Sequence, residues 1–247
     1  LQSVADRVVD AYLFASTEVG LEWVDRRIIK QSGKIAAIMQ SSSRFQPIDK
    51  HAARVKLGIG GSPLFLWVGR LDPNKDPLTV IRAFNRFAAT RPDARLYMIY
   101  TDAPLLPNVR DAIAQAPSPA LIALVGTVKN KELETWYSAA DFILSGSHSE
   151  GSGIAVIEAM SCGCIPIVTT IPSFRAMTAD GTVGFLYPPG DAGALLDRLH
   201  HATTTDLPAL GQRVRKRFER ELSFPALAHK IRTLAADLGR FQGTEQG

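Results

Sequence analysis

The sequence predicts an α/β fold in which a doubly wound parallel sheet carries helices on both faces. Apolar runs of strand length alternate with amphipathic stretches of helix length along most of the 247 residues. Such alternation indicates parallel strands that are joined by crossover helices. The hydrophobic content of 46% and the charged content of 21% are those of an ordinary globular protein.

The clearest unit of this kind lies between Asp141 and Pro166. An apolar run at 142–144 is typical of a buried strand, a polar loop with three glycines follows at 145–153, and a helical pattern occupies 154–162. Strand, loop and helix in this order put the loop at the carboxyl edge of the sheet. Open α/β folds bind their ligands at that edge.

The other elements are predicted from the same patterns. Strands are expected at 12–16, 34–39, 64–68, 94–100, 121–125 and 165–169, and helices at 18–31, 77–89, 107–115, 129–140, 195–201, 207–220 and 225–238. Pro77 suits the first turn of its helix, and Asn130 is expected as an N-cap. Residues 49–62 are interpreted as a connector, 170–175 as a loop and 243–247 as a frayed end.

Two carboxylates bracket the polar loop of the central unit. Glu150 belongs to the loop and Glu158 to the helix that follows it. Gly151 and Gly153 leave the backbone free to approach a ligand closely, and the start of the helix offers unpaired N–H groups to an anion. The alternative interpretation is a packing unit of strand and helix with solvated glutamates.

Two cations follow the strand expected at 64–68. Arg70 offers a planar fork of donors and Lys75 a mobile ammonium, a pair that suits a diphosphate. The alternative is two solvated surface cations. The net charge of +4 also suits an anionic ligand, or a peripheral contact with acidic lipid, and is too small to indicate nucleic acid.

These residues resemble a known signature. Glu150 and Glu158 with seven residues between them look like the E-x7-E motif of retaining glycosyltransferases of the GT-B fold. The run Gly69-Arg70-Leu71 with Lys75 is similar to that family's first phosphate-binding loop. The resemblance covers nearly all of the chain and implies a Rossmann-like domain that forms the C-terminal half of a GT-B fold.

The resemblance also implies roles for individual residues. Glu150, Arg70 and Lys75 are expected to be catalytic: Glu150 orients the sugar hydroxyls, with a nucleophilic role left open, and the two cations stabilise the departing diphosphate. Glu158 is expected to hold the ribose hydroxyls. The full set expected to bind substrate is Gly69, Gly126, Val128, Gly151, Ser152, Gly153, Ile154, Ala155 and Glu158. Val128, expected at the nucleobase, fits equally well as a core residue at a strand end.

The same resemblance predicts the domain organisation. Residues 1–47 are expected to be a remnant of the N-terminal acceptor domain with the interdomain connector, 48–240 the sugar-nucleotide-binding domain, and 241–247 a tail. Residues 184–191 are similar to the family's closing strand and turn, with Asp191 as the N-cap of the next helix. Most of the N-terminal domain is missing in this interpretation, so the isolated chain is expected to bind the donor without transferring sugar.

The chain offers no pattern for a metal or a cofactor. No Asp-x-Asp cluster follows a strand, so metal independence is expected. Cys162 and Cys164 stand one residue apart without further ligands, which favours reduced cytosolic thiols. No apolar run reaches the length of a membrane span. We therefore expect a cytoplasmic protein, with the inner face of the membrane as a site of peripheral contact.

The sequence thus predicts an enzyme that moves a sugar from a nucleotide-diphosphate sugar to an acceptor hydroxyl with retention of configuration. The acceptor is expected to be a saccharide or a lipid-linked molecule in bacterial polysaccharide or glycoconjugate synthesis. Two other classes stay open at this point. One is a nucleotide-sugar epimerase of the GT-B fold, and the other is a noncatalytic nucleotide-binding module.

Overall fold

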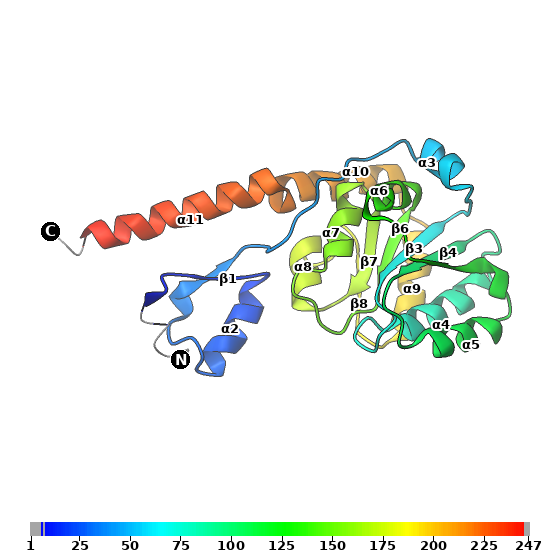
Figure 1. Ribbon diagram of the computed structural model, residues 1–247, viewed down its shortest axis with the longest axis horizontal. Coiled ribbons are helices and arrows are strands. Elements are labelled where there is room, and N and C mark those ends of the chain that lie inside the picture. Colours follow the sequence, from blue (N-terminus) through cyan, green and yellow to red (C-terminus); the bar gives the residue numbers. More distant parts are fainter. Residues whose placement is uncertain (1–5, 7, 245–247) are drawn as a thin grey trace.

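Six parallel strands form the main sheet in the part of the chain that the computed structural model describes, residue 6 and residues 8–244 (Figure 1). These strands are β3 (Leu64–Gly69), β4 (Arg95–Tyr100), β5 (Ile122–Gly126), β6 (Phe142–Ser145), β7 (Ile165–Thr169) and β8 (Phe185–Tyr187). Every neighbouring pair is parallel. The predicted fold class is therefore confirmed.

The strand order is β5-β4-β3-β6-β7-β8. The chain builds the sheet outward from β3 through β4 to β5, and it then returns to the other side of β3 to place β6, β7 and β8. The direction of building thus reverses between β3 and β6. In a doubly wound sheet, such a switch point leaves a crevice at the carboxyl ends of the two strands.

Helices cover both faces of this sheet because successive strand residues point to opposite faces. In β3, Phe65 and Trp67 belong to one buried cluster, and Leu64 and Leu66 belong to a second cluster. Helix α4 (Pro77–Ala88) packs against α5 (Leu106–Ala114) and α9 (Ala192–Ala202), whereas α6 (Asn130–Ala139) packs against α3 (Lys50–Leu57). Figure 1 shows the first group at the lower right and the second at the top.

The turns that start these helices follow local rules. Asp76 accepts a hydrogen bond from the Thr79 amide at 3.1 Å, and Pro77 occupies the first turn of α4 as expected. Asp191 accepts from the Ala194 amide at 2.8 Å and caps α9, which confirms the predicted N-cap. Asn130 is not an N-cap, because Lys129 holds that position and Asn130 begins α6.

The predicted connector at 49–62 contains a helix, α3. Asp49 accepts from the Ala52 amide at 2.8 Å, and Gly58 ends the helix in the left-handed region with φ 63°. Both capping residues can be recognised in the sequence. The segment was nevertheless interpreted as a connector because of its charged composition. The helix is held by Asp141, the first residue of the central unit.

Asp141 anchors α3 to the sheet. Its side chain is 11% exposed and accepts from Lys50 Nζ at 2.6 Å and from Arg54 Nη2 at 2.9 Å. The backbone amide of Leu64, at the start of β3, donates to the same carboxylate at 2.8 Å. One side chain therefore ties a helix, a strand start and the entry to β6 together.

Three further boundaries differ from the expectation. Helix α8 (Pro172–Thr178) occupies most of the loop expected at 170–175, since Pro172 pre-sets the backbone of a first helical turn. The helix expected at 207–220 is α10 (Leu207–Arg217) followed by a π-helical turn, η3 (Phe218–Leu222). Helix α11 (Phe224–Thr244) continues into the expected tail, whose residues 245–247 lie outside the described residues.

A small unit lies apart from the main sheet. Strand β1 (Tyr12–Phe14) pairs in parallel with β2 (Ile35–Ala37), and α2 (Thr17–Asp25) with the turn η1 (Ser32–Lys34) connects them. The helix is shorter than the expected 18–31 and is followed by Arg27 at φ 57°. Figure 1 shows this unit at the lower left, on the side toward which α11 extends from the sheet.

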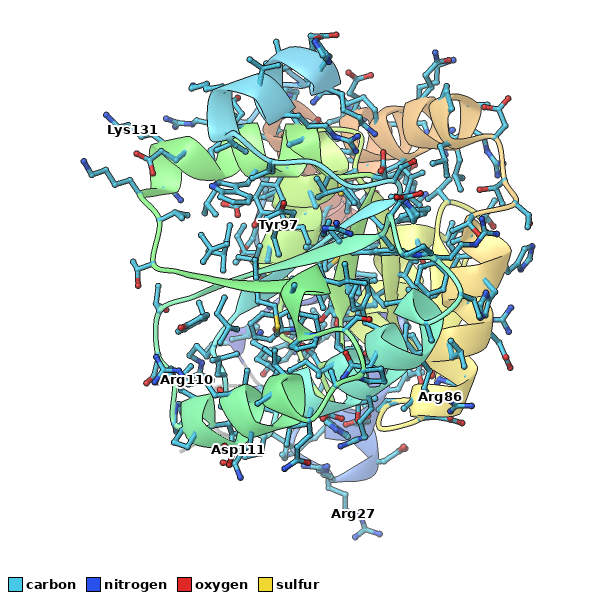
Figure 2. All side chains as sticks on the ribbon, turned by 90° about the vertical axis from the view of Figure 1, so that its right-hand side faces the viewer. Arg27, Arg86, Tyr97, Arg110, Asp111 and Lys131 are labelled. Atoms are coloured by element: carbon cyan, nitrogen blue, oxygen red, sulfur yellow. The ribbon has the colours of Figure 1, made fainter. Side chains whose placement is uncertain are left out.

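Figure 2 distinguishes the surface from the packed interior on the β5 side of the molecule. Arg86 of α4 and Arg110 of α5 point outward, whereas Tyr97 of β4 is partly buried. The Tyr97 ring packs against Trp136 of α6 with 5.6 Å between centroids. No helix in the described part of the chain combines the length and the apolar character needed to cross a bilayer.

Candidate active site

A cavity of about 630 Å³ opens at the switch point between β3 and β6. Its walls come from the ends of β3, β4 and β6, from the loops after β3, β5 and β6, from α6, and from α7 (Ile154–Ser161). This volume lies within the usual range for small-molecule sites. The topology therefore places the cavity where the sequence predicted ligand binding.

Most of the predicted site residues line this cavity. They are Gly69, Arg70, Lys75, Val128, Glu150, Ser152, Gly153, Ile154, Ala155 and Glu158. Two predicted residues lie outside the wall: Gly126 ends β5 with φ 81°, and Gly151 is exposed in the loop before α7. The structure thus brings together residues that are up to 89 positions apart in the chain, as from Gly69 to Glu158.

The start of α7 is shaped by Gly153. Its backbone is left-handed with φ 56°, and a Cβ built there would lie 2.6 Å from Cε1 of Phe174. Only glycine satisfies both the backbone conformation and the close approach. No side chain caps this helix. The N–H groups of the first turn, at Ile154 and Ala155, therefore remain available to an anion in the cavity.

Lys75 and Glu150, which both line the cavity, form an ion pair between Nζ and Oε1. Their side chains are only 22% and 12% exposed. Ser147 Oγ donates to the same Glu150 oxygen at 2.6 Å, and Ser145 Oγ lies 3.0 Å from Ser147 Oγ. The network fixes the carboxylate of Glu150 and the ammonium of Lys75 beside the start of α7.

Arg70 stands at a more exposed point of the cavity wall. Its side chain is 56% exposed, and Nη2 pairs with Asp72 Oδ2 at 2.9 Å. Asp72 also accepts from the Lys75 amide at 2.9 Å through Oδ1. Asp72, which the sequence analysis passed over, therefore shapes the loop that presents both cations.

The loops after β3 and β6 are joined by direct contacts. The His148 amide donates to Asn74 O at 2.8 Å, and Asn74 Nδ2 donates to Ser149 O at 3.0 Å. His148 Nε2 also lies 3.2 Å from Asp76 Oδ2. His148 does not line the cavity. Its contacts instead hold the loops after β3 and β6 together.

Glu158 on α7 is hydrogen-bonded by a side chain of α6. The hydroxyl of Tyr137 donates to Glu158 Oε2 at 3.0 Å, and both residues line the cavity. Burial raises the pKa of Glu158, and the hydrogen bond from Tyr137 opposes that rise. Tyr137 was not predicted as a site residue, because nothing in a single helix pattern indicates which neighbour its hydroxyl meets.

Part of the cavity wall is apolar. Ile99 and Tyr100 at the end of β4, Val128 in the loop after β5, and Leu133 on α6 line it. The cavity lining therefore combines apolar side chains with an ion pair, a combination suited to a ligand with an aromatic group and an anionic group. Among the residues that the structure describes, no group of three or more His, Cys, Asp or Glu side chains could hold a metal ion.

The fold and the cavity define the chain as a Rossmann-like domain of the type found in GT-B glycosyltransferases. Sucrose-phosphate synthase from Thermosynechococcus elongatus superposes with a TM-score of 0.77 at 22% identity, over 97% of this chain and 61% of that one. The C-terminal domain of the glycosyl transferase group 1 family protein LpcC from Francisella tularensis gives a TM-score of 0.66 at 21% identity, over 73% of this chain and 96% of that one.

The chain belongs to the glycosyl transferases group 1 family, whose model matches residues 49–218. The D-inositol 3-phosphate glycosyltransferase 2 of Catenulispora acidiphila is 30% identical over 215 residues, which are 79% of this chain and 50% of that relative. This chain therefore spans about half the length of that curated relative.

Proposed function

We propose that this chain is the donor-binding part of a retaining glycosyltransferase that uses a nucleotide-diphosphate sugar. The observation that carries the proposal is the single cavity shared by the Lys75–Glu150 ion pair, the uncapped start of α7, and Glu158. These groups suit the sugar, the diphosphate and the ribose of such a donor, and the apolar wall suits its base.

The hard step of the proposed reaction is the departure of the nucleoside diphosphate. The bond between the anomeric carbon and the β-phosphate oxygen breaks, and a bond from the acceptor oxygen to that carbon forms on the same face. The acceptor's proton passes to the departing phosphate oxygen. Lys75, Arg70 and the first N–H groups of α7 stabilise the negative charge that develops on the phosphate oxygens. Glu150 orients the sugar hydroxyls.

The acceptor is a hydroxyl of a small saccharide, of a lipid-linked molecule or of a phosphorylated cyclitol. The last class is suggested by the name of the relative from Catenulispora acidiphila, which acts on D-inositol 3-phosphate by its printed description. The pathway we propose is bacterial polysaccharide or glycoconjugate synthesis. Because the chain spans about half of that relative, we expect donor binding without efficient transfer by these 247 residues.

The test compares binding with turnover. UDP, GDP, ADP and their glucose derivatives are titrated into the chain, and the products with each acceptor class are analysed by NMR for anomeric configuration. Two results support the proposal. One diphosphate binds to this chain, and a longer protein that also contains the part of the relative that this chain does not span transfers the sugar with retention of its anomeric configuration. Interconversion of the sugar without an acceptor would instead identify an epimerase, and binding without any chemistry in the longer protein a noncatalytic module.

A further inference from the structure

Tyr137 and Glu158 face each other across two helices that meet beside the cavity. The Tyr137 hydroxyl on α6 donates to Oε2 of Glu158 on α7 at 3.0 Å. Tyr137 is fully buried, and its ring lies 6.2 Å from that of Phe45, centroid to centroid. It belongs to the apolar cluster that also contains Cys162 and Cys164. Packing therefore fixes the position of the phenol before any ligand binds.

Burial and the contact with Glu158 both keep the proton on the Tyr137 phenol. Burial raises the pKa of Tyr137 well above its ordinary range, and the nearby Glu158 raises it further. Tyr137 therefore keeps its proton near neutral pH and acts as a donor. In the described part of the chain, Tyr137 is the side-chain partner of the Glu158 carboxylate, since Ser161 Oγ donates at 2.7 Å to the Glu158 backbone carbonyl instead.

We propose that Tyr137 is the positioning residue for the carboxylate that binds the ribose, and so sets the selectivity of the site for ribonucleotides over deoxyribonucleotides. Its hydroxyl occupies one oxygen of Glu158 and leaves the other, Oε1, as the acceptor for a ribose hydroxyl. This inference rests on the proposed function, because it needs a nucleotide whose ribose lies at Glu158.

The physical reason is geometric. A carboxylate on a helix samples several side-chain rotamers, and a hydrogen bond to a fixed donor selects one of them. A hydroxyl of the ligand is then met by a pre-oriented acceptor, which lowers the ordering cost of binding. Without the phenol, Glu158 still lines the cavity but is no longer held in that orientation.

The experiment uses UDP, GDP and ADP with their 2′-deoxy and 3′-deoxy counterparts, titrated calorimetrically into the 247-residue chain. We expect the wild type to prefer one ribonucleotide over its deoxy form by about tenfold, the scale of a hydrogen bond to a charged group. Tyr137→Phe should reduce that preference to about twofold, with little change in affinity for the deoxy form.

Tyr187→Phe is the matched control. Tyr187 is equally buried, but its hydroxyl donates to the backbone carbonyl of Ser145 at 2.8 Å. Both variants lose a buried hydroxyl and should lose some thermal stability, whereas only Tyr137→Phe should change the ratio of ribo to deoxyribo affinity. In a Glu158→Ala background, Tyr137→Phe should have no further effect on that ratio, because the two residues act as one unit.

The outcomes distinguish the positioning role of Tyr137 from the proposed donor site. A wild-type preference for the ribonucleotide that Tyr137→Phe leaves intact overturns the inference and leaves the donor site standing. A further loss of the ratio when Tyr137→Phe is added to Glu158→Ala also overturns it. If the wild type binds no nucleoside diphosphate, or binds ribo and deoxyribo forms equally, the inference fails together with the proposed role of Glu158.

Discussion

Replacing Asp141 by Ala should destabilise the chain strongly, although Asp141 lies outside the cavity wall. Its carboxylate is 11% exposed and accepts from Lys50, Arg54 and the Leu64 amide. The substitution leaves a buried amide unpaired, which costs about 1–3 kcal/mol. It also removes the carboxylate partner of Arg54 Nη2, on a side chain that is 23% exposed, and leaves only the bond from Arg54 Nε to the Ala139 carbonyl.

The contribution of Lys50 is small, because its side chain is 46% exposed and solvent screens the pair. The sum points to a loss of about 3 kcal/mol in the free energy of unfolding, near the lower end for breaking a buried ion pair from one side. The assay is urea unfolding followed by circular dichroism, analysed by linear extrapolation. Hydrogen exchange should also show faster exchange in α3, since that helix loses its anchor.

Glu219→Ala is the matched control for this prediction. Glu219 also pairs with an arginine, at 2.7 Å from Arg215 Nε, but its side chain is 54% exposed. We expect it to lose less than about 1 kcal/mol. Equal losses for Asp141→Ala and Glu219→Ala, or unchanged exchange in α3, would refute the reasoning that one buried carboxylate anchors the helix.

Three further predictions concern the cavity and the junction before α11. Lys75→Ala should weaken nucleoside diphosphate binding by about 1.5–3 kcal/mol in calorimetry, whereas Arg86→Ala, on the exposed side of α4, should not change it. Gly153→Ala should lower the free energy of unfolding by about 1–3 kcal/mol and weaken the same binding, because φ is 56° and the added carbon meets an aromatic carbon at 2.6 Å. The hydrogen bond from Lys230 holds the pKa of Glu221 below its ordinary value of 4.5, so the ionised Glu221 stabilises the fold above that pH. The difference in free energy of unfolding between the wild type and Glu221→Gln should therefore vanish as the pH falls through the lowered pKa.

Each of these predictions has an outcome that would contradict it. Equal affinities of Lys75→Ala and the wild type would remove the proposed phosphate contact. Gly33→Ala is the control for Gly153→Ala, since a carbon added there meets nothing within 4 Å; similar losses at both glycines would argue against a steric cause. A stability difference for Glu221→Gln that persists unchanged in acid would show that charge is not its origin.

The sequence predicted the fold and the edge of the sheet where the cavity lies, because both follow from local patterns. The strand, loop and helix around Glu150 are encoded within 26 residues, from Asp141 to Pro166, and parallel topology brings the ends of its strands to one edge. The cations after β3 could be placed at the same edge for the same reason. Periodicity and turn chemistry were sufficient for these conclusions.

Partnerships between distant side chains could not be read in this way. The Lys75–Glu150 pair spans 75 positions, and Tyr137 reaches Glu158 across 21. Such contacts depend on how the helices and strands pack against one another, and a single sequence does not reveal that packing. Helix α3 is a different kind of omission: its caps at Asp49 and Gly58 were readable, and its charged residues were taken for those of a linker.

Calorimetric titration of UDP, GDP and ADP into the wild-type chain and into Lys75→Ala tests the proposed donor site most directly. We expect at least one diphosphate to bind the wild type with a Kd below about 1 mM, to raise its Tm, and to bind Lys75→Ala about ten to a hundred times more weakly. Absence of binding by all three at millimolar concentration, or binding that Lys75→Ala leaves unchanged, would contradict the assignment of this cavity to a nucleotide-diphosphate sugar.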